Sequence, residues 1–578
     1  MADSLLSINN LSVDFVTDTS VTHALNNISF EVNKGEIVAV VGESGSGKSV
    51  TSLSILQLMA SPPAVYTQGE IIFYSNNKIS ENVLQLPDVS LRNIRGNKIS
   101  MIFQEPMTSL NPLFSCGNQV MEVILLHQKL TAKEARKKVV ELFSKVQLPE
   151  PDKIFDRFPH EISGGQKQRV MIAMAISCEP ELLIADEPTT ALDVTVQKSV
   201  LQLIRQLQLE KNISVIFITH DLGLVAEIAD RVVVMYKGNI VEQGKVTAIF
   251  SNPQHPYTKA LLACRPSLHA KGERLPVVSD FMELNNEGVI VEKKDADALY
   301  IKQHSLQLPA KNISHTSDIP LLQVKNISVI FPHKKKLFAR SQQYTKAVSD
   351  VSFEIYKRET VGLVGESGCG KTTLGRSILR LLEPTTGDVM FNGKNLRTLT
   401  DAEMRSERKH MQIIFQDPYS SLNPRLTVGN TIAEAMMVHS IGKDAAERRE
   451  MIGEILKKVD LKPKQYDNYP HEFSGGQRQR VGIARALALN PSFIICDESV
   501  SALDVSVQAQ VLNLLNDLKA EYGFCMLFIS HDLSVVRYIS DRVLVMHKGI
   551  IVEAGRTEEI YNNPLQDYTK KLIAASPK

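Results

Sequence analysis

The feature that most constrains this sequence is a glycine-rich stretch that occurs twice. Residues 42–49 read Gly-Glu-Ser-Gly-Ser-Gly-Lys-Ser, and residues 365–372 read Gly-Glu-Ser-Gly-Cys-Gly-Lys-Thr. Both fit the phosphate-binding loop, in which a glycine and four further residues precede Gly-Lys-Ser or Gly-Lys-Thr. Apolar runs at 37–41 and 360–364 predict a buried strand before each loop, and residues 50–59 predict a helix after the first. This context favours phosphate binding over a glycine-rich turn that binds nothing.

The two loops carry groups that suit a nucleotide and its metal ion. Glycine residues let backbone N–H groups turn inward around phosphate oxygens, and a helix N-terminus adds partial positive charge. We expect Lys48 and Lys371 to reach the phosphates, and Ser49 and Thr372 to hold Mg²⁺. The predicted nucleotide-binding loop residues are Gly42, Glu43, Ser44, Gly45, Ser46, Gly47, Lys48, Ser49, Gly365, Glu366, Ser367, Gly368, Cys369, Gly370, Lys371 and Thr372.

Other polar residues recur in the same order at nearly constant intervals. The interval is 323 positions for the loop lysines, 312 for a glutamine, and 311 for a serine, a glutamate and a histidine. The pairs are Lys48 and Lys371, Gln104 and Gln416, Ser163 and Ser474, Glu187 and Glu498, and His220 and His531. The chain of 578 residues is therefore a tandem duplication of one domain of roughly 250 residues. We expect the first domain at 1–265, a weakly patterned linker at 266–317 and the second domain at 318–578.

The order of apolar segments predicts an α/β fold in each copy. Alternating apolar residues at 5–15 and 321–331 predict strands at the start of each domain. A helix-rich middle follows, for example at 131–146, where Thr131 and Glu134 predict a capping box. Short apolar strands then alternate with helices, which is typical of a mostly parallel sheet covered by helices.

In both copies an apolar strand ends in a pair of carboxylates. Asp186 and Glu187 follow one such strand, and Asp497 and Glu498 follow its counterpart. Nucleotide sites lie at the carboxyl edge of parallel sheets. We expect the aspartates to help hold Mg²⁺ and the glutamates to polarise an attacking water, because phosphoryl transfer needs a positioned nucleophile. Next to a phosphate-binding loop, this interpretation is favoured over an ordinary acidic strand end.

Three weaker motifs gain weight because both halves contain them in the same order. Gln104 and Gln416 each end an apolar strand, and His220 and His531 each precede an aspartate. Ser-Gly-Gly-Gln opens a predicted helix in each half, where free N–H groups suit an anion. Its candidate residues are Ser163, Gly165, Gln166, Ser474, Gly476 and Gln477. Alone, such residues are usually turns, polar surface or structural histidines.

Composition narrows the possible function classes. A net charge of +1 argues against broad electrostatic binding to nucleic acid. No apolar run approaches the ~18 residues that cross a bilayer, and the N-terminus lacks the basic start and apolar core of a signal peptide. The six cysteines contain no CxxC pair, so we expect reduced thiols without a zinc or disulfide framework. These features favour a protein of the cytoplasm, or of the cytoplasmic side of a membrane.

As a set, these motifs resemble the nucleotide-binding domain of ABC transporters, twice over. The match includes the phosphate loop, the glutamine, the Ser-Gly-Gly-Gln signature, the Asp-Glu pair, Ala-Leu-Asp at 191–193 and 502–504, and the histidine. The resemblance implies a tandem duplication of the P-loop ABC-type domain, with a mostly parallel sheet core, an antiparallel β subdomain and a helical subdomain. It also implies ATP and Mg²⁺ as ligands and ATP hydrolysis as the activity.

In that family two such domains pack head to tail, and each ATP lies between one phosphate loop and the other domain's signature. Carried over to this chain, Lys48 would share a site with Ser474 and Gly476. Lys371 would share the other site with Ser163 and Gly165, so one chain would supply an intramolecular dimer. For the residue that stacks on adenine, Phe15, His23 and Tyr344 all stay candidates.

A narrower resemblance concerns two pairs of segments. Residues 252–262 and 563–572, and residues 103–112 and 415–424, look like parts of oligopeptide/dipeptide importer ATPases. Among fused members, the chain is most similar to the glutathione-importing branch, and next to the microcin C type. The resemblance implies a motor subunit on the cytoplasmic face of the inner membrane. Its partners would be two membrane-spanning permease subunits and a periplasmic or extracellular solute-binding protein.

The sequence also bears on alternatives to a peptide cargo and on alternatives to an importer. Another small solute, such as nickel, stays open because the cargo would be selected by other subunits. A twin-ABC ATPase acting on ribosomes should carry a Lys/Arg-rich helical linker, whereas residues 266–317 are nearly neutral. A DNA-repair ATPase of the same superfamily should carry zinc-binding CxxC pairs. Some relatives bind an iron–sulfur cluster in a cysteine-rich tail, but only Cys264 lies near the first tail, so we expect no cluster.

Overall fold

A computed structural model describes the chain over residues 4–18, 20–75, 80–104, 109–189, 192–284, 290–293, 319–332, 344–417, 419–501 and 503–576. Several sequence-based interpretations fall outside these ranges. They concern the parts of the predicted linker at 285–289 and 294–317, residues 105–108 after Gln104, residue 418, and the alanines at 191 and 502. The described residues form two compact units. The first contains residues 4–262 and 278–293, and the second contains residues 263–277 and 319–576.

The first unit is built around a six-stranded sheet with the order β10-β9-β3-β8-β7-β6. All neighbours pair in parallel except β10, which pairs antiparallel with β9. Every residue of β3, β7 and β8 is buried, as expected for a sheet with both faces covered. The strands are β3 (Ile37–Val41), β6 (Ile99–Ile102), β7 (Leu182–Asp186), β8 (Ser214–Ile218), β9 (Arg231–Tyr236) and β10 (Asn239–Lys245).

An antiparallel sheet and two groups of helices cover this central sheet. The antiparallel sheet, β2-β1-β4-β5, packs its apolar face on β3, β7, β8 and β9. Its strands are β1 (Ser4–Val16), β2 (Val21–Asn33), β4 (Ala64–Tyr74) and β5 (Ser80–Asn82). The helices are α1 (Lys48–Ile55), α2 (Asp88–Ile94), α4 (Cys116–His127), α5 (Ala132–Lys145), α6 (Pro151–Asp156), α7 (Gly164–Ile176), α8 (Val194–Lys211), α9 (Leu222–Ile228), α10 (Val246–Ser251), α11 (Pro256–Ala263) and α12 (Val278–Phe281).

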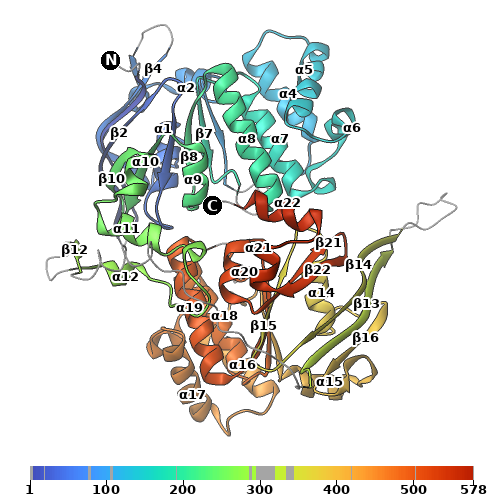
Figure 1. The fold of residues 1–578 in the computed structure, drawn as a ribbon. Coiled ribbons are helices and arrows are strands. Elements are labelled where there is room, and N and C mark those ends of the chain that lie inside the picture. The colour runs from blue at the N-terminus through green and yellow to red at the C-terminus, as the bar shows by residue number, and fades with distance from the viewer. Residues whose placement is uncertain are drawn as a thin grey trace. The chain divides into compact units, whose positions relative to one another are not determined.

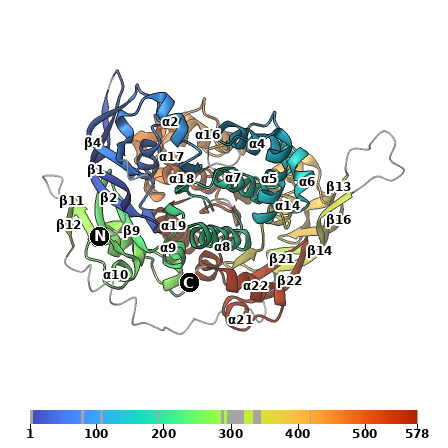
Figure 2. The same ribbon diagram turned by 90° about the horizontal axis from the view of Figure 1, so that it is seen from above.

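Within the first unit, α4, α5 and α6 form a helical subdomain. They lie at the opposite end of the unit from β1, β2 and β4 in both views (Figures 1 and 2). The predicted capping box is confirmed, because the Thr131 side chain accepts the Glu134 N–H and the Glu134 carboxylate accepts the Thr131 N–H. A short hairpin of β11 (Met282–Leu284) and β12 (Ile290–Glu292) completes the unit.

The second unit repeats this architecture, which confirms the predicted duplicated α/β fold. Its central sheet has the order β18-β19-β20-β15-β21-β22, and its antiparallel sheet has the order β14-β13-β16-β17. The strands are β13 (Leu322–Pro332), β14 (Tyr344–Ile355), β15 (Thr360–Val364), β16 (Thr386–Phe391), β17 (Lys394–Asn395), β18 (Met411–Ile414), β19 (Phe493–Asp497), β20 (Cys525–Ile529), β21 (Arg542–His547) and β22 (Ile550–Arg556). The helices are α14 (Lys371–Ile378), α15 (Asp401–Arg408), α16 (Val428–Val438), α17 (Ala445–Lys458), α18 (Gly475–Leu487), α19 (Val505–Tyr522), α20 (Leu533–Ile539), α21 (Thr557–Asn562) and α22 (Asp567–Ala575).

The second unit also contains Ala263–Val277, which we call the strap. The sequence placed most of this segment in the linker, but the structure packs it on α19 and α20. Leu275 is fully buried in the main core of the second unit. Its N–H donates to Asn513 Oδ1 at 2.9 Å, and Asn513 Nδ2 donates to the Leu275 carbonyl oxygen at 2.8 Å. The strap is therefore held both by apolar burial and by hydrogen bonds to its backbone.

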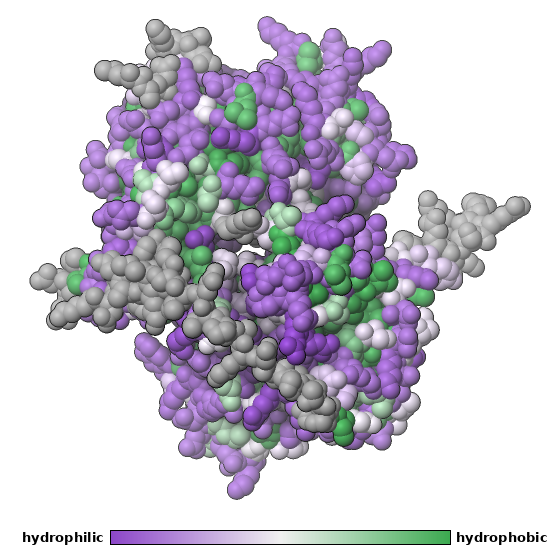
Figure 3. All heavy atoms as spheres, viewed as in Figure 1, coloured by the Kyte–Doolittle hydropathy of each residue, from purple (hydrophilic) through white to green (hydrophobic). Residues whose placement is uncertain are grey.

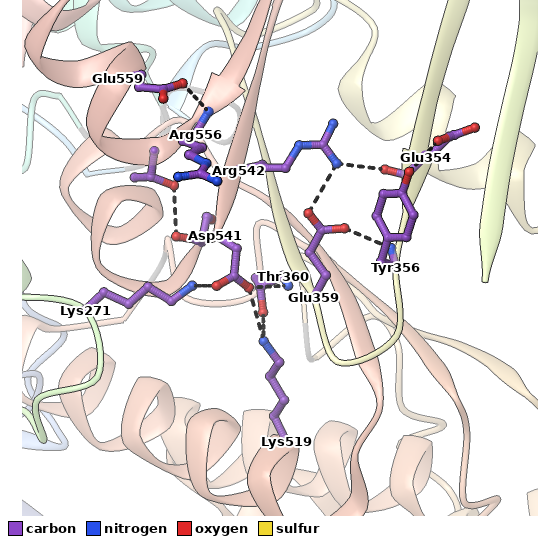
Figure 4. Close-up of polar contacts among 12 residues, drawn as sticks. Lys271, Glu354, Tyr356, Glu359, Thr360, Lys519, Asp541, Arg542, Arg556 and Glu559 are labelled. Atoms are coloured by element: carbon purple, nitrogen blue, oxygen red, sulfur yellow. Dashed lines mark hydrogen bonds and ion pairs between the residues drawn. The ribbon is translucent and has the colours of Figure 1, made fainter. Parts of the chain in front are cut away.

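An ion-pair cluster fixes the strap beside the first residue of β15 (Figure 4). Lys271 donates to Asp541, while Lys519 Nζ lies 3.5 Å from the other carboxylate oxygen of Asp541. That second oxygen accepts the Thr360 N–H at 2.8 Å. Burial alone would raise the pKa of Asp541, but the two lysines outweigh burial and hold this pKa below its usual range. The carboxylate therefore remains ionised although it is largely enclosed.

The visible surface of each unit is mostly hydrophilic, and its apolar residues gather in small patches (Figure 3). Among the described residues, none of the helices combines the length and the apolar character needed to cross a membrane.

Leu275→Ala tests whether the strap belongs to the core of the second unit. The substitution should lower the free energy of unfolding of this unit by about 2 to 5 kcal/mol, because it leaves a cavity in a packed core. Hydrogen exchange of the amides in α19 and α20 should report the loss. The matched control is Leu268→Ala, since Leu268 lies in the same segment but is 39% exposed. Equal protection in the two variants would contradict the assignment.

Candidate functional site

The two phosphate-loop stretches connect a central strand to a helix in each unit. Lys48 and Lys371 are the first residues of α1 and α14, and neither helix has a side-chain N-cap. Only glycine fits directly before these lysines. The backbone there has a φ of 102° at Gly47 and 110° at Gly370, and a Cβ on Gly370 would lie 2.2 Å from the Ala347 carbonyl oxygen. The loop shape thus leaves backbone N–H groups at the helix start available to an anion.

Both loop lysines are buried and fold back over their own loops. Lys48 Nζ donates to the carbonyl oxygens of Gly42 and Glu43 at 2.7 and 2.9 Å. Lys371 Nζ makes the same pair of contacts with its loop, and it also lies 4.0 Å from Glu498 Oε1. Each ammonium group is therefore held by backbone carbonyl oxygens of its own loop, where it can neutralise the charge of a bound phosphate.

In each unit a hydroxyl at the start of the helix after the phosphate loop lies near a carboxylate that ends β7 or β19, two strands away in the sheet order. Thr372 Oγ1 donates to Asp497 Oδ1 at 3.0 Å, and in the first unit, where Ser49 stands in the place of Thr372, Ser52 Oγ donates to Asp186 Oδ2 at 3.5 Å. Asp186 Oδ1 is buried without a hydrogen-bond partner. Burial, with the charge of Glu187 adding to it, raises the pKa of Asp186 to about 6, and burial likewise raises the pKa of Asp497. A hydroxyl beside an incompletely satisfied carboxylate is a donor set that fits Mg²⁺.

The glutamate after each aspartate adopts a backbone conformation that is rare for this residue type. The φ angles are 48° at Glu187 and 47° at Glu498, in the left-handed region. The Glu187 N–H donates to the Ile218 carbonyl oxygen at the end of β8, and the second unit repeats this contact. Strained conformations of this kind cost about 1 to 3 kcal/mol and persist at functional sites. At this turn the backbone leaves the direction of the strand, so the glutamate does not continue the strand.

The predicted glutamine and histidine both contact this glutamate in each unit. Gln104 Nε2 donates to Glu187 Oε2 at 3.2 Å, and His220 Nδ1 lies 3.3 Å from the other carboxylate oxygen. In the second unit the corresponding contacts of Glu498 are 2.8 Å to Gln416 and 3.3 Å to His531. Burial raises the pKa of Glu498, but its contacts with His531 and Lys371 outweigh burial and lower it below the usual range. The carboxylate is therefore ready to accept a proton or to orient a water.

The Ser-Gly-Gly-Gln motifs form a separate feature at the start of α7 and α18. Ser163 and Ser474 are the N-caps, and each forms a capping box with the glutamine three residues later. A Cβ on Gly476 would lie 2.4 Å from Val507 on the next helix, so this glycine permits close helix packing. The sequence predicted a helix start here, which the structure confirms; the role of the motif in binding stays a prediction.

The three candidate adenine-stacking residues all lie on the antiparallel sheets. Phe15 is on β1, and His23 is on β2 with its Nδ1 2.8 Å from Asp14 Oδ1. Tyr344 begins β14 and is 60% exposed.

Two tyrosines that the sequence motifs did not indicate also contact the phosphate loops. Tyr257 on α11 is fully buried, and its hydroxyl accepts the Glu43 N–H at 2.9 Å. Tyr568 on α22 accepts the Glu366 N–H at 3.1 Å in the same way. The sequence Tyr-Thr-Lys recurs in both domain ends and could have signalled this role. The C-terminal helix of each domain thus contacts the first residues of the phosphate loop of the same domain.

Tyr257→Phe should weaken nucleotide binding at the first loop by about fivefold or more. The change keeps the buried ring but removes the acceptor of a buried backbone N–H, and such a loss costs about 1 to 3 kcal/mol. Nucleotide titration by fluorescence or calorimetry would measure the effect, and Tyr568→Phe should act alike on the second loop. Tyr236→Phe is the control, because that ring packs against Tyr257. Wild-type affinity in both loop variants would rule out the positioning role.

Comparison with known proteins agrees with this geometry. The family model described as "ABC transporter" matches residues 25–190 and 348–501, and the model "Oligopeptide/dipeptide transporter, C-terminal region" matches residues 241–285 and 552–578. The chain is 47% identical to the glutathione import ATP-binding protein GsiA of Pectobacterium atrosepticum, over 99% of this chain and 89% of that protein. It is also 47% identical to the protein of that name in Escherichia coli, over 100% of this chain and 90% of that protein. Family models that cover more than half of the sequence, and relatives of this similarity over nearly all of it, show that the chain belongs to the ABC transporter family.

Proposed function

We propose that this protein is the ATP-hydrolysing motor subunit of an importer of small peptides, with glutathione as the leading candidate cargo. The observation that carries the proposal is the 47% identity, along 99% of the chain, to proteins named glutathione import ATP-binding protein. The two matches to the oligopeptide/dipeptide transporter region support a peptide cargo. The repeated Lys, Asp-Glu, Gln and His constellation supports the ATPase activity in both halves.

In this proposal each half contributes the same set of groups to ATP. Lys48 and Lys371 bind the phosphates, together with the loop N–H groups. Ser49 with Asp186, and Thr372 with Asp497, are the residues that would hold Mg²⁺, whose charge would offset that of the phosphates when it is bound. The ligand set is thus a hydroxyl from the start of a helix and a carboxylate from a strand end, and the buried, unpaired Oδ1 of Asp186 supports it.

The strand-end glutamates are the proposed catalytic bases. Glu187 and Glu498 would orient the attacking water and accept its proton, because the carboxylate lies beside the phosphate loop and is ionised at neutral pH in the second unit. Gln104 and His220 would hold the two different oxygens of Glu187, whereas Gln416 and His531 would both hold Oε2 of Glu498. The predicted sharing of each ATP between one half's loop and the other half's Ser-Gly-Gly-Gln motif stays a prediction from the sequence.

The proposed partners follow from the role as a motor. Two permease subunits would carry the cargo path, and a solute-binding protein would deliver the cargo. The chain would act peripherally on the cytoplasmic face of the membrane. Gln104 and Gln416 each connect the glutamate contact to the segment that precedes the helical subdomain. In this position the two glutamines could transmit a conformational change at the ATP site to a docked permease.

Replacing both proposed bases tests the ATPase assignment. The double variant Glu187→Gln and Glu498→Gln should lose ATP turnover by about 100-fold or more, because an amide cannot accept the proton. It should still bind ATP, at about two molecules per chain, since two loops are present. Filter binding of labelled ATP and phosphate release would measure both quantities. Control variants on exposed helix surfaces, Glu141→Gln and Glu450→Gln, should keep wild-type turnover; full turnover in the double variant would refute the assignment.

Uptake in cells tests the proposed cargo. Deletion of the gene, in a strain without another importer for the same cargo, should abolish uptake of labelled glutathione or of short peptides. The wild-type gene should restore uptake, whereas the variant with both glutamates replaced should not. Normal uptake of both cargo types in the deletion strain would reject the cargo assignment, while leaving the ATPase assignment to the previous experiment.

A further inference from the structure

The second unit shows how its α19–α20 surface binds an extended segment. The strap lies on this surface, where Asn513 on α19 donates to and accepts from the backbone of Leu275. The Leu275 side chain enters the apolar core. From α20, the Tyr538 hydroxyl donates to the Glu273 carbonyl oxygen at 2.6 Å. Arg274 forms an ion pair of 2.9 Å with Asp517.

The first unit carries an open groove at the corresponding place, between α8 and α9. Its volume is about 420 Å³, within the ~300 to 1,000 Å³ of ordinary ligand clefts. Its lining includes Leu201, Gln202 and Ile228, which stand 311 positions before Leu512, Asn513 and Ile539. The duplicated fold therefore presents the same apolar floor and the same amide-bearing position in both units. In the second unit these positions bind a peptide segment of the chain itself.

The rim of the first groove indicates what kind of segment would fit. Gln202 is exposed and its amide has both a donor and an acceptor, as Asn513 has. Leu209 is 68% exposed at the groove, so it offers apolar surface that a partner's side chain can cover. Glu210 and Glu227 add two exposed carboxylates, and the cation in the same lining, Arg205, has its guanidinium 3.7 Å from Asp230 Oδ1. The rim therefore complements an apolar side chain next to a basic one, as in the strap's own Arg274 and Leu275.

We propose that the groove between α8 and α9 of the first unit is a docking site for an extended peptide segment of a partner protein. The segment carries a basic side chain directly beside a leucine or a similar apolar side chain. Its apolar side chain covers Leu209 beside Leu201 and Ile228, its backbone pairs with the Gln202 amide, and its basic side chain faces Glu210 and Glu227. This surface lies apart from the phosphate loops, so docking serves assembly and leaves ATP chemistry to the residues already described.

A labelled peptide with the sequence of residues 269–277, His-Ala-Lys-Gly-Glu-Arg-Leu-Pro-Val, provides the probe. It should bind the full-length protein saturably, as measured by fluorescence anisotropy. Gln202→Ala and Leu209→Asp should each weaken this binding by about fivefold or more, because each removes one of the proposed contacts. A peptide with Glu and Ser in place of Arg and Leu should not bind. Glu141→Gln on α5 is the protein control, and ATP turnover should be unchanged in all variants.

Three outcomes would overturn the proposal. The first is the absence of saturable binding at peptide concentrations up to about 1 mM, which is a weak affinity for any specific complex. The second is equal binding to the groove variants and to wild type, which would mean that the peptide binds elsewhere, for example by displacing the strap. The third is self-association of the protein in sedimentation that Leu209→Asp abolishes, which would assign the groove to a second copy of the chain. Because Gln202 and Leu209 are both exposed, neither substitution should disturb folding.

Discussion

The alignment of parallel strands is the constraint on which the rest of each unit depends. In the first unit β3 ends at the phosphate loop, β7 ends at Asp186 and β8 ends beside His220. Since parallel strands bring their carboxyl ends to one edge, groups separated by more than a hundred residues meet there. The helices and the antiparallel sheet bury the two faces, and the edge is left for polar chemistry. A substitution that shifted one of these strands along its neighbours would therefore displace several functional groups at once.

The functional groups at this edge of the sheet could be predicted because their sequence motifs are local and occur twice. A glycine-rich loop, an apolar strand with two carboxylates, and a polar residue after an apolar run can each be recognised within ten residues. Their partners could not be predicted in the same way. The contact between the Tyr257 hydroxyl and the Glu43 N–H joins residues 214 positions apart, and no periodic pattern in the sequence predicts it. The left-handed backbone of Glu187 and Glu498 is likewise invisible, because tertiary contacts impose it against the preference of the residue.

The strap escaped prediction for a different reason. Leu275 is a single apolar residue among Lys271, Glu273 and Arg274, so composition favoured a solvated linker. Its ordered state depends on Asn513, which lies 238 positions later and can bond both the N–H and the carbonyl of one residue. One side chain with two hydrogen bonds can thus fix a segment that carries no secondary-structure signal. Sequence patterns report periodic burial, and they do not report such isolated anchors.

The two copies also neutralise equivalent aspartates, Asp230 and Asp541, with different basic residues. Asp230 accepts the Ile37 N–H at the start of β3, as Asp541 accepts the Thr360 N–H at the start of β15. Asp230 has Arg205 at 3.7 Å and is partly exposed, whereas Asp541 is enclosed by Lys271 and Lys519. The contact to the backbone is the same in both copies, whereas the counter-charge comes from a helix arginine in the first copy and from a helix lysine together with a strap lysine in the second. Duplication therefore preserved the backbone geometry of the sheet more strictly than the side chains that neutralise it.

The position of the strap has a consequence for how this polypeptide can be divided. The helix that supports the first phosphate loop, α11, ends at Ala263, and the strap begins at the same residue. A cloned second half that began at residue 318, where the repeat itself begins, would lack the leucine that completes its core and the lysine that balances Asp541. A cut at residue 263 would keep the second unit intact, but it would remove residues 278–293 from the first unit, where Met282 is buried beside Tyr257. The repeat boundary and the boundary of the second unit therefore differ, because residues 263–277, which precede the repeat, belong to the second unit.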